Sequence, residues 1–437
     1  MRKQKALLLP QVKNRDPDNL LYCTIRDFES KKIVARRVLC GIFFPVSHRG
    51  TVDVVFYPTE NHTGAFYLPA LSAEGKSVGA QYSVKLNEVW QTGFATGTRD
   101  DVSFISTCGG PASTAKIVRL LGNREGKFVK GGVFWLTECP LINTAMIVTS
   151  SYTGAVKAKQ VVRHRFTLRS GARLVFRKHF VNDRDRNGER ISQLVAEFAV
   201  TRVVPKIHFQ AVIDDLDDML LLASFAMRRR CVCTGWSYFD ENGTLTHFYR
   251  RNLALPPEGR IDLQSCLISM QTFPKFLRSV YPRFLGSSHK ELVRNAIYNL
   301  TNDGGTLENS FLRVFAGLES VLLHVARSNG RSGRPRHLED AFKFFQRFHP
   351  VNLVDLWPLV DSSGGTSLAE IRNRLIHGEY LSEKSTRALV FAELNLRWTV
   401  ERMLLSVLGW HIMGTHVTPS FLSHITMYQW TASRKMI

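Results

Sequence analysis

The residue pattern of the chain changes once, between residues 270 and 286, and this change limits the available folds more than any other feature. Residues 1–275 contain short segments rich in β-branched and aromatic residues, such as VDVVFYP and GGVFWLTE, separated by Gly, Pro, Asn and Asp. Such segments are typical of strands joined by turns. After Pro282 the apolar residues recur at helical spacing. The sequence therefore predicts an α+β chain, with a β-rich N-terminal half of one or two subdomains over residues 1–275 and an all-helical domain over 276–437.

The helical half contains several segments with a clear apolar stripe. TLENSFLRVFAGLESVLLHVAR and STRALVFAELNLRWTVERMLLSVLG predict the two longest helices, and HLEDAFKFFQRF and NLVDLWPLV predict shorter ones. One more helix is expected inside the β-rich half, at AVIDDLDDMLLLASFAMRR. The residues expected to face the core of the two long helices are Phe311, Val314, Phe315, Leu318, Leu322 and Val325, then Leu389, Leu396, Val400, Met403 and Val407.

Two segments of the β-rich half predict hairpins. In YFDENGTLTHFYRR, the dipeptide Asn242-Gly243 favours a two-residue type I′ turn between aromatic-rich strands. In RFTLRSGARLVFR, a three-residue loop of Ser170, Gly171 and Ala172 keeps the apolar residues on one face of the hairpin. Those apolar residues are Phe166, Leu168, Leu174 and Phe176.

The second hairpin also carries four arginines on its other face. The predicted register places Arg169 opposite Arg173 and Arg165 opposite Arg177. Positive side chains directly opposite each other repel unless an anion lies between them. This face therefore contacts nucleic acid, or it is exposed to solvent, or it pairs with the acidic segment DDLDD.

Charge and composition narrow the partners and the compartment. The formal net charge of +21 over 437 residues predicts an anionic partner, with nucleic acid ahead of a membrane surface. No run reaches the ~18 apolar residues of a membrane span. The seven cysteines are scattered and odd in number, which predicts reduced, mostly buried thiols in a cytoplasmic protein. The sequence contains no P-loop, dinucleotide glycine motif, H-E-x-x-H or G-x-S-x-G pattern.

The segment EIRNRLIHGEYLS predicts one short, well-capped helix. Ser367 and Glu370 match the S-x-x-E capping box, and Gly378 suits the left-handed position just past a helix end. The helix is thus expected over about 368–377, with an apolar face of Leu368, Ile371 and Leu375.

The polar residues of this helix fall into two groups. At ~100° per residue, Asn373 and His377 lie close together with Arg374 beside them, whereas Arg372 lies ~140° around the helix from His377. Arg372 and His377 can act together if the helix end frays or if a second copy of the chain contributes one of them. The alternative is an ordinary helix end, in which a histidine of the last turn interacts with the helix dipole.

The helices around this segment, the acidic residue within FAGLESVLL and the segment RNRLIHG resemble the HEPN superfamily, in which R-N-x-x-x-H is the ribonuclease signature. The likeness covers about residues 285–412 and rests on Arg372, Asn373, His377 and Gly378, with Glu319 as a supporting acid. A β-rich N-terminal region joined to such a domain is similar to the ApeA-type antiphage branch. The loop RSNGRSGRPRH departs from the family pattern.

The resemblance implies a metal-independent, cofactor-free endoribonuclease that acts as a homodimer in prokaryotic antiphage defence, with a phage-derived trigger sensed by the N-terminal half. RNA carries its own nucleophile, the 2′-hydroxyl, so the protein must supply a proton carrier and a positive charge. His377 suits general acid/base work and Arg372 suits phosphate binding. Asn373 is expected to orient one of them, and Glu319 either pairs with Arg372 or is a solvated edge residue. The alternative function is a non-catalytic module that dimerises and binds RNA.

Further arginines are candidates for contacts with nucleic acid. The loop 327–337 either grips RNA near the site or is a solvated loop. The predicted nucleic-acid-binding residues are Arg374, the four hairpin residues Arg165, Arg169, Arg173 and Arg177, and the loop residues Arg331, Arg334 and Arg336.

Overall fold

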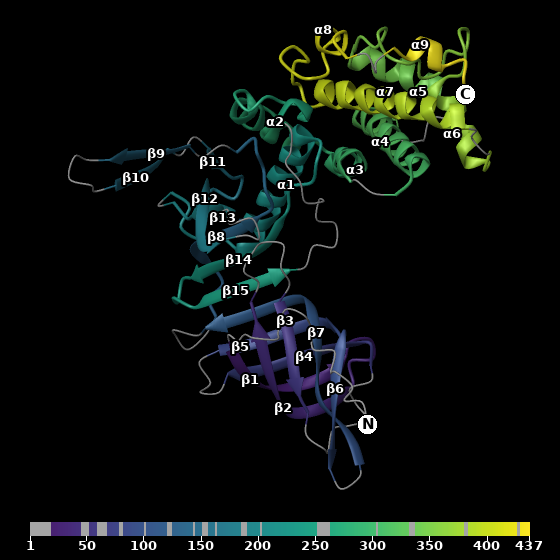
Figure 1. Ribbon diagram of the computed structural model, residues 1–437. Helices are drawn as coiled ribbons and strands as arrows, with labels where there is room; N and C mark the ends of the chain where they lie inside the picture. Colours follow the sequence, from purple (N-terminus) through teal and green to yellow (C-terminus); the bar gives the residue numbers. More distant parts are fainter. Residues whose placement is uncertain are drawn as a thin grey trace. The chain divides into compact units, whose positions relative to one another are not determined.

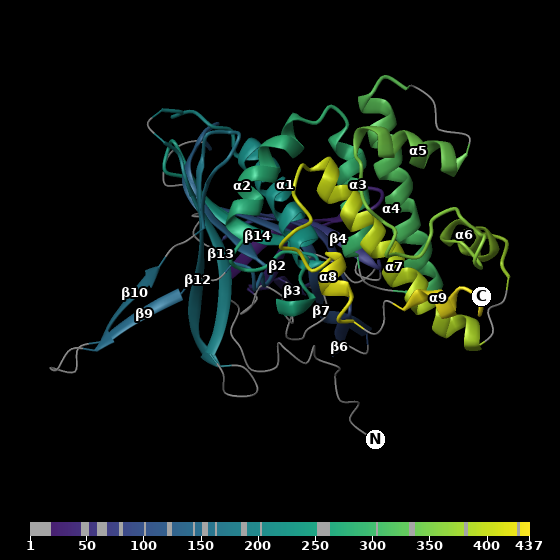
Figure 2. The same cartoon turned by 90° about the horizontal axis from the view of Figure 1, so that it is seen from above.

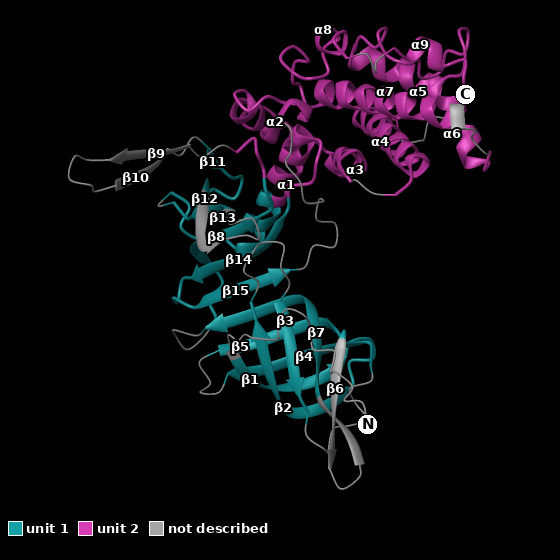
Figure 3. Cartoon of the chain, in the orientation of Figure 1, with its two compact units in different colours: residues 1–138, 144–216, 232–255 teal, residues 139–143, 217–231, 256–437 magenta. Residues whose placement is uncertain are grey.

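The chain forms two compact units, which Figure 3 colours separately. The first comprises Met1–Glu138, Thr144–Leu216 and Val232–Leu255, and the second comprises Cys139–Asn143, Asp217–Cys231 and Pro256–Ile437. The computed structural model describes residues 19–44, 52–58, 68–77, 82–99, 102–119, 125–142, 145–150, 156–161, 164–184, 190–201, 203–250, 263–302, 305–331, 337–379, 383–425 and 429–437. The predicted α+β class is confirmed. The predicted division into two domains after residue 275 stays a prediction.

The described strands belong to the first unit. They are β1 (Asn19–Asp27), β2 (Ile33–Phe43), β3 (Val52–Tyr57), β4 (Ala70–Ser77), β5 (Tyr82–Trp90), β6 (Gly93–Arg99), β7 (Val102–Arg119), β8 (Val129–Leu136), β9 (Ala145–Ser150), β10 (Val156–Val161), β11 (Arg165–Thr167), β12 (Arg173–Arg184), β13 (Arg190–Ala199), β14 (Cys233–Asp240) and β15 (Leu245–Arg250). Their neighbours pair in an antiparallel manner throughout.

Six of these strands close into an antiparallel barrel, visible in Figure 1. The order is β7-β3-β2-β1-β4-β5, and β5 pairs again with β7 to complete the ring. Alternate residues point inward, as in β3, where Val52, Val54 and Phe56 are buried. From β7 the sheet continues through β15, β14, β8, β13 and β12 to β11. Apolar residues at alternate positions of the strands therefore fill a closed core.

The hairpin of β11 and β12 differs from the predicted register. Leu168 N–H donates to Ala172 O at 2.9 Å, so the three-residue loop is Arg169, Ser170 and Gly171, one position earlier than predicted. Gly171 has φ +87°, and three-residue loops place the left-handed residue last. Arg173 therefore pairs with Thr167, and the predicted Arg169–Arg173 pair is wrong.

The same shift moves the other predicted arginine pair. Arg165 lies opposite Val175 and not opposite Arg177. When the loop moves by one position, each residue of β12 pairs with a residue of β11 two positions from the predicted one. A change of two positions keeps every side chain on its own face, because side chains alternate with a period of two. The predicted apolar face is thus confirmed, with Phe166, Leu168, Leu174 and Phe176 all buried.

The β14–β15 hairpin shows the same kind of difference. Asp240 N–H donates to Thr244 O, so the loop contains Glu241, Asn242 and Gly243 and is not the predicted two-residue type I′ turn. Gly243 has φ +78° and again occupies the third loop position. The aspartate side chain accepts the N–H groups of Asn242 and Thr244, which stabilises the longer loop.

Helix α1 (Phe209–Met227) confirms the helix expected within the β-rich half. The other described helices are α2 (Phe273–Gly286), α3 (Lys290–Thr301), α4 (Leu307–Ser328), α5 (Leu338–Phe348), α6 (Leu368–Ile376), α7 (Glu383–Val407), α8 (Pro419–Leu422) and α9 (Trp430–Ser433). Helix α4 lies at the centre of the second unit and contacts α3, α5, α6 and α7. Figures 1 and 2 show α4 and α7 side by side.

The predicted core stripes of α4 and α7 are largely confirmed. All six residues predicted for α4 are buried, as are Leu389, Leu396, Val400 and Met403 of α7, while Val407 is half-buried. The helix predicted at NLVDLWPLV is wrong, since residues 351–360 contain only turns and irregular backbone. Pro358 lacks an N–H, and the buried Arg402 instead holds this segment through Asp355 and Asn352 O.

The seven cysteines are all free thiols and all buried, as predicted. Three of them, Cys23, Cys40 and Cys108, belong to the barrel core. Burial raises the pKa of Cys108 to about 12, which keeps its thiol protonated at neutral pH. Over the described residues, every helix is too short or too polar to cross a membrane.

Candidate functional site

Helix α6 begins at the predicted capping box. The Ser367 side chain accepts the Glu370 N–H at 3.3 Å, and the Glu370 carboxylate accepts the Ser367 N–H at 2.7 Å. This backbone hydrogen bond is the main reason that the pKa of Glu370 is lowered. Leu368 and Ile371 are fully buried, so the helix is fixed to the second unit by one face. The cap and the buried face set the direction in which the polar residues of α6 point.

The other end of α6 also matches the prediction. His377 is the C-cap residue, and its N–H donates to Asn373 O at 3.1 Å. Gly378 has φ +74°, the left-handed conformation expected after a helix end. His377 is exposed, and its neighbour Ile376 is 52% exposed. The imidazole is therefore presented to solvent beside an uncovered apolar side chain.

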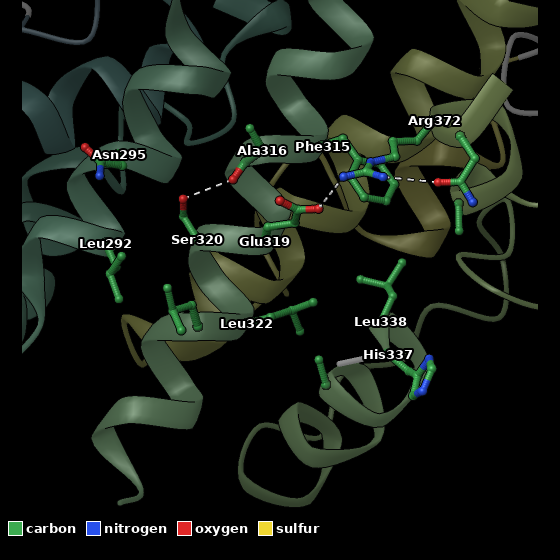
Figure 4. A pocket seen from close by; sticks show the side chains of 14 residues that line it. Leu292, Asn295, Phe315, Ala316, Glu319, Ser320, Leu322, His337, Leu338 and Arg372 are labelled. Carbon is green, nitrogen blue, oxygen red and sulfur yellow. Dashed lines mark hydrogen bonds and ion pairs between the residues drawn. The ribbon is translucent and has the colours of Figure 1, made fainter. Parts of the chain in front are cut away.

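Arg372 is held by groups on two helices. Its Nη2 donates to Glu319 Oε1 of α4 at 3.2 Å, and its Nη1 donates to Asn373 Oδ1 at 3.1 Å. The guanidinium also lies over the ring of Phe315, at 5.7 Å from its centroid. Figure 4 shows the Arg372 and Glu319 side chains pointing toward each other. The predicted contact between Glu319 and Arg372 is thus present, and it fixes the fork of the guanidinium in one orientation.

Arg372 and Glu319 border a cleft of about 670 Å³ between α3, α4, α5 and α6. His377 is not among the described residues that line this cleft. A smaller hollow of about 430 Å³ includes Asn373 and Arg374. The lining residues of the larger cleft are Leu292, Asn295, Phe315, Ala316, Glu319, Ser320, Leu322, Leu323, His337, Leu338, Ala341, Ala369, Arg372 and Asn373.

One chain therefore brings together three of the four predicted catalytic residues. Arg372, Asn373 and Glu319 form a single hydrogen-bonded group, whereas His377 lies around the helix from Arg372. A fixed guanidinium at the edge of a cleft can bind a phosphate through two N–H groups. An exposed imidazole can carry a proton between substrate and solvent. A guanidinium and an imidazole are thus presented by one helix and its C-cap, and only the guanidinium lines the cleft.

Two of the other arginines predicted in the second unit, Arg374 and Arg331, have protein partners. Arg374 forms an ion pair with Glu379 and donates to Ile437 O. Arg331 lies over the Phe344 ring, 4.0 Å from its centroid. Arg334 and Arg336 lie outside the described residues. Both contacts of Arg374 are with the protein itself, and they stabilise the end of α6.

The hairpin arginines of the first unit are arranged more loosely. Arg165, Arg169 and Arg173 are exposed, and Arg177 pairs with Glu197 at 2.7 Å. The DDLDD segment does touch this hairpin, but through the backbone: Ser170 N–H donates to Asp215 Oδ2 at 2.6 Å. The basic face can still bind an anion. The arginines are not paired opposite each other, so their repulsion is no longer a reason to expect an anion between them.

The sequence did not indicate three polar residues of the cleft. Asn295, Ser320 and His337 come from α3, α4 and the N-cap of α5, and only packing brings them to one place. The cap position of His337, just before two acidic residues of a first helical turn, was the one available signal.

Among the described residues, no three His, Cys, Asp or Glu side chains converge as a metal site would need. Comparisons with protein-family models, with curated proteins and with solved structures find no match. The HEPN likeness therefore rests on the residues of α4 and α6 alone.

Proposed function

We propose that this protein is a HEPN-type endoribonuclease that cleaves RNA at α6 without a metal ion. The observation that carries the proposal is the geometry of Arg372, which Glu319 and Asn373 hold at the edge of a cleft while His377 is exposed at the end of the same helix. Each residue type has a chemical task in RNA cleavage. The formal charge of +21 supports a polyanionic substrate.

In this mechanism His377 removes the proton from a ribose 2′-hydroxyl. The 2′-oxygen then attacks the adjacent phosphorus, and Arg372 neutralises the charge that develops on the equatorial oxygens. The P–O5′ bond breaks, and the 5′-oxygen takes a proton from an imidazolium. The products are a 2′,3′-cyclic phosphate and a 5′-hydroxyl.

The separation of His377 from the Arg372 cleft calls for a second copy of the chain. When α6 meets its two-fold mate, His377 of each protomer reaches the phosphate bound by Arg372 of the other. Ile376, which is 52% exposed next to His377, supplies apolar surface for that contact. A homodimer thus completes a site that one chain leaves divided.

The biological role that fits this activity is antiphage defence. A ribonuclease of this kind, directed at cellular or phage RNA, must be restrained until infection. In the proposal the β-rich first unit senses a phage-derived trigger and restrains the nuclease.

A non-catalytic RNA-binding and dimerisation module is the second candidate. The observation that favours it is the position of His377 outside the residues that line the Arg372 cleft. A binding module would use Arg372 and the basic surface and would need no proton carrier.

The test is RNA cleavage by purified wild type, Arg372→Ala and His377→Ala in the presence of EDTA, with the 3′ ends identified. The proposal expects cleavage by wild type alone, leaving a cyclic phosphate. Removal of either residue lowers the rate by a factor of roughly 100 or more. Equal cleavage by all three proteins contradicts it. RNA binding without cleavage by wild type and by His377→Ala, weakened in Arg372→Ala, with and without phage lysate as the source of trigger, favours the binding module.

A further inference from the structure

The cleft that Arg372 borders extends well beyond the group that holds a phosphate. Figure 4 shows Asn295 of α3 at the opposite end from Arg372, with Glu319 and Ser320 of α4 between them. His337 and Leu338, at the start of α5, form another wall. Phosphate chemistry at Arg372 uses only one end of this cleft.

The remainder of the cleft combines apolar walls with a few polar groups. Leu292, Leu323 and Leu338 line it with half-buried apolar side chains. Asn295 contributes an amide and His337 an imidazole. Apolar walls suit the faces of a planar ring, and amide and imidazole groups suit its hydrogen-bonding edge. These are the properties of a nucleobase.

We propose that this cleft binds one unpaired nucleobase of the RNA, next to the phosphate held by Arg372. The inference rests on the proposed function for the position of the phosphate. A volume of about 670 Å³ lies within the ~300–1,000 Å³ of small-ligand pockets, so a base and its ribose can enter. The positive charge at one end and the net charge of +21 favour a nucleotide of a polyanionic chain over an apolar ligand.

Occupation of the cleft sets two properties of the substrate. A base within a duplex is stacked and paired, so only single-stranded segments can place a base there. The groups at the edge of the bound base, from Asn295 and His337, then distinguish one base from another. RNA with unpaired bases is the substrate class, and the base beside the cleavage position is selected.

The test fills the cleft without disturbing the core. Ala316 lines the cleft, is exposed and lies on α4, so Ala316→Phe places a ring in the space of the base. Ser328→Phe is the matched control, because Ser328 is exposed in the last turn of the same helix and does not line the cleft. Both changes are made in the full chain with His377→Ala, which keeps the RNA intact, and thermal unfolding verifies each fold.

Binding is measured with two fluorescent probes of equal length, a single-stranded oligoribonucleotide and a base-free ribose-phosphate chain. We expect Ala316→Phe to weaken binding of the oligoribonucleotide about ten-fold, the order of one lost base stack, and to leave the base-free chain unchanged. Ser328→Phe leaves both unchanged. Equal affinity of Ala316→Phe and Ser328→Phe for the oligoribonucleotide, or an equal loss on both probes, overturns the base site.

A second variant and a cleavage arm separate this inference from the proposed function. Asn295→Ala removes an exposed amide and serves if Ala316→Phe fails to fold; it is expected to change the relative affinities for the four homopolymers. With His377 restored, the Ala316→Phe protein should cleave with a raised KM. If this protein cleaves RNA with unchanged KM and base preference, the base site is contradicted and the proposed nuclease activity is not. If Ala316→Phe weakens base binding but the protein cleaves no RNA, the nuclease activity is contradicted and the base site is not.

Discussion

Arg372 is the residue on which the proposed chemistry of the site depends. Its two terminal nitrogens donate to different acceptors, Glu319 and Asn373, and its plane lies over Phe315. A guanidinium held in this way loses little conformational freedom when a phosphate arrives. The sequence left two readings open for Glu319, a partner of Arg372 or a solvated edge residue, and the structure shows the contact. The sequence did not predict the ring of Phe315 beneath, which was assigned only to the core stripe.

Replacement of Arg372 by lysine separates charge from geometry. An ammonium keeps the positive charge but lacks the planar fork that reaches Glu319 and Asn373 together. We expect Arg372→Lys to keep RNA affinity within about three-fold, since one charge is retained. Its cleavage rate should fall by a factor of roughly 10 to 100. Single-turnover cleavage and fluorescence anisotropy measure the two effects, and a full rate in Arg372→Lys would show that the fork is not used.

His324 makes the second unit sensitive to pH. It is buried within α4, burial lowers its pKa from 6.5, and its Nδ1–H donates to His289 O at 3.2 Å. In the unfolded chain the imidazole takes up a proton near its ordinary pKa, whereas in the folded state it resists one. Below pH 6.5 the unfolded state therefore binds more protons, and stability falls as the pH falls.

We accordingly expect wild type to lose unfolding free energy between pH 7.5 and pH 5.5, and His324→Gln to lose less. Glutamine keeps a hydrogen-bonding side chain but does not titrate in this range. Urea unfolding at both pH values measures the difference. An identical pH dependence in the two proteins would rule out His324 as its source.

At the scale of elements, helix α6 was predicted almost completely and the two hairpins were not. The ends of α6 are coded locally, by a serine and a glutamate three residues apart and by Gly378. The first hairpin loop lies one position earlier than predicted, and the second is one residue longer than predicted. In both, a glycine, Gly171 or Gly243, takes the third position of a three-residue loop. In each hairpin an aspartate side chain accepts a backbone N–H of the loop: Asp240 accepts that of Asn242, and Asp215 of α1 accepts that of Ser170. The contact of Asp215 joins residues 45 positions apart, so the local sequence pattern does not reveal it.

The left-handed end of α6 gives a direct stability test. An added Cβ at Gly378 meets nothing within 4 Å, so Gly378→Ala changes the backbone energy alone. With φ at +74°, alanine should cost about 1 kcal/mol of unfolding free energy. Gly286→Ala is the matched control: its space is also open, it ends α2, and its φ is not among the positive values, so a neutral or slightly stabilising effect is expected. Equal effects of the two changes would contradict the assigned conformation.

At the scale of the whole molecule, the sequence indicated where strands give way to helices but not how either set closes. Alternating apolar residues identify strands, and they carry no information on the β5–β7 pairing that joins the ends of the barrel. The cleft likewise exists because α3, α5 and α6 pack around α4. Both features depend on contacts between residues far apart in the chain, which a local pattern does not specify.

The two-sided arrangement of α6 makes a prediction about assembly. If Arg372 of one protomer acts with His377 of the other, then a dimer of one Arg372→Ala chain and one His377→Ala chain has one site that lacks both residues and one site that is intact. Each variant alone forms dimers in which every site lacks one residue. Exchange of subunits between two inactive proteins should therefore restore activity.

The most direct measurement is RNA cleavage by the two variants mixed after subunit exchange, compared with wild type and with each variant alone. The shared-site account predicts two inactive proteins and a mixture that recovers about a quarter of the wild-type rate, since half of the dimers are mixed and each has one intact site. A mixture as inactive as its components, beside an active wild type, would show that Arg372 and His377 act within one chain or not together at all.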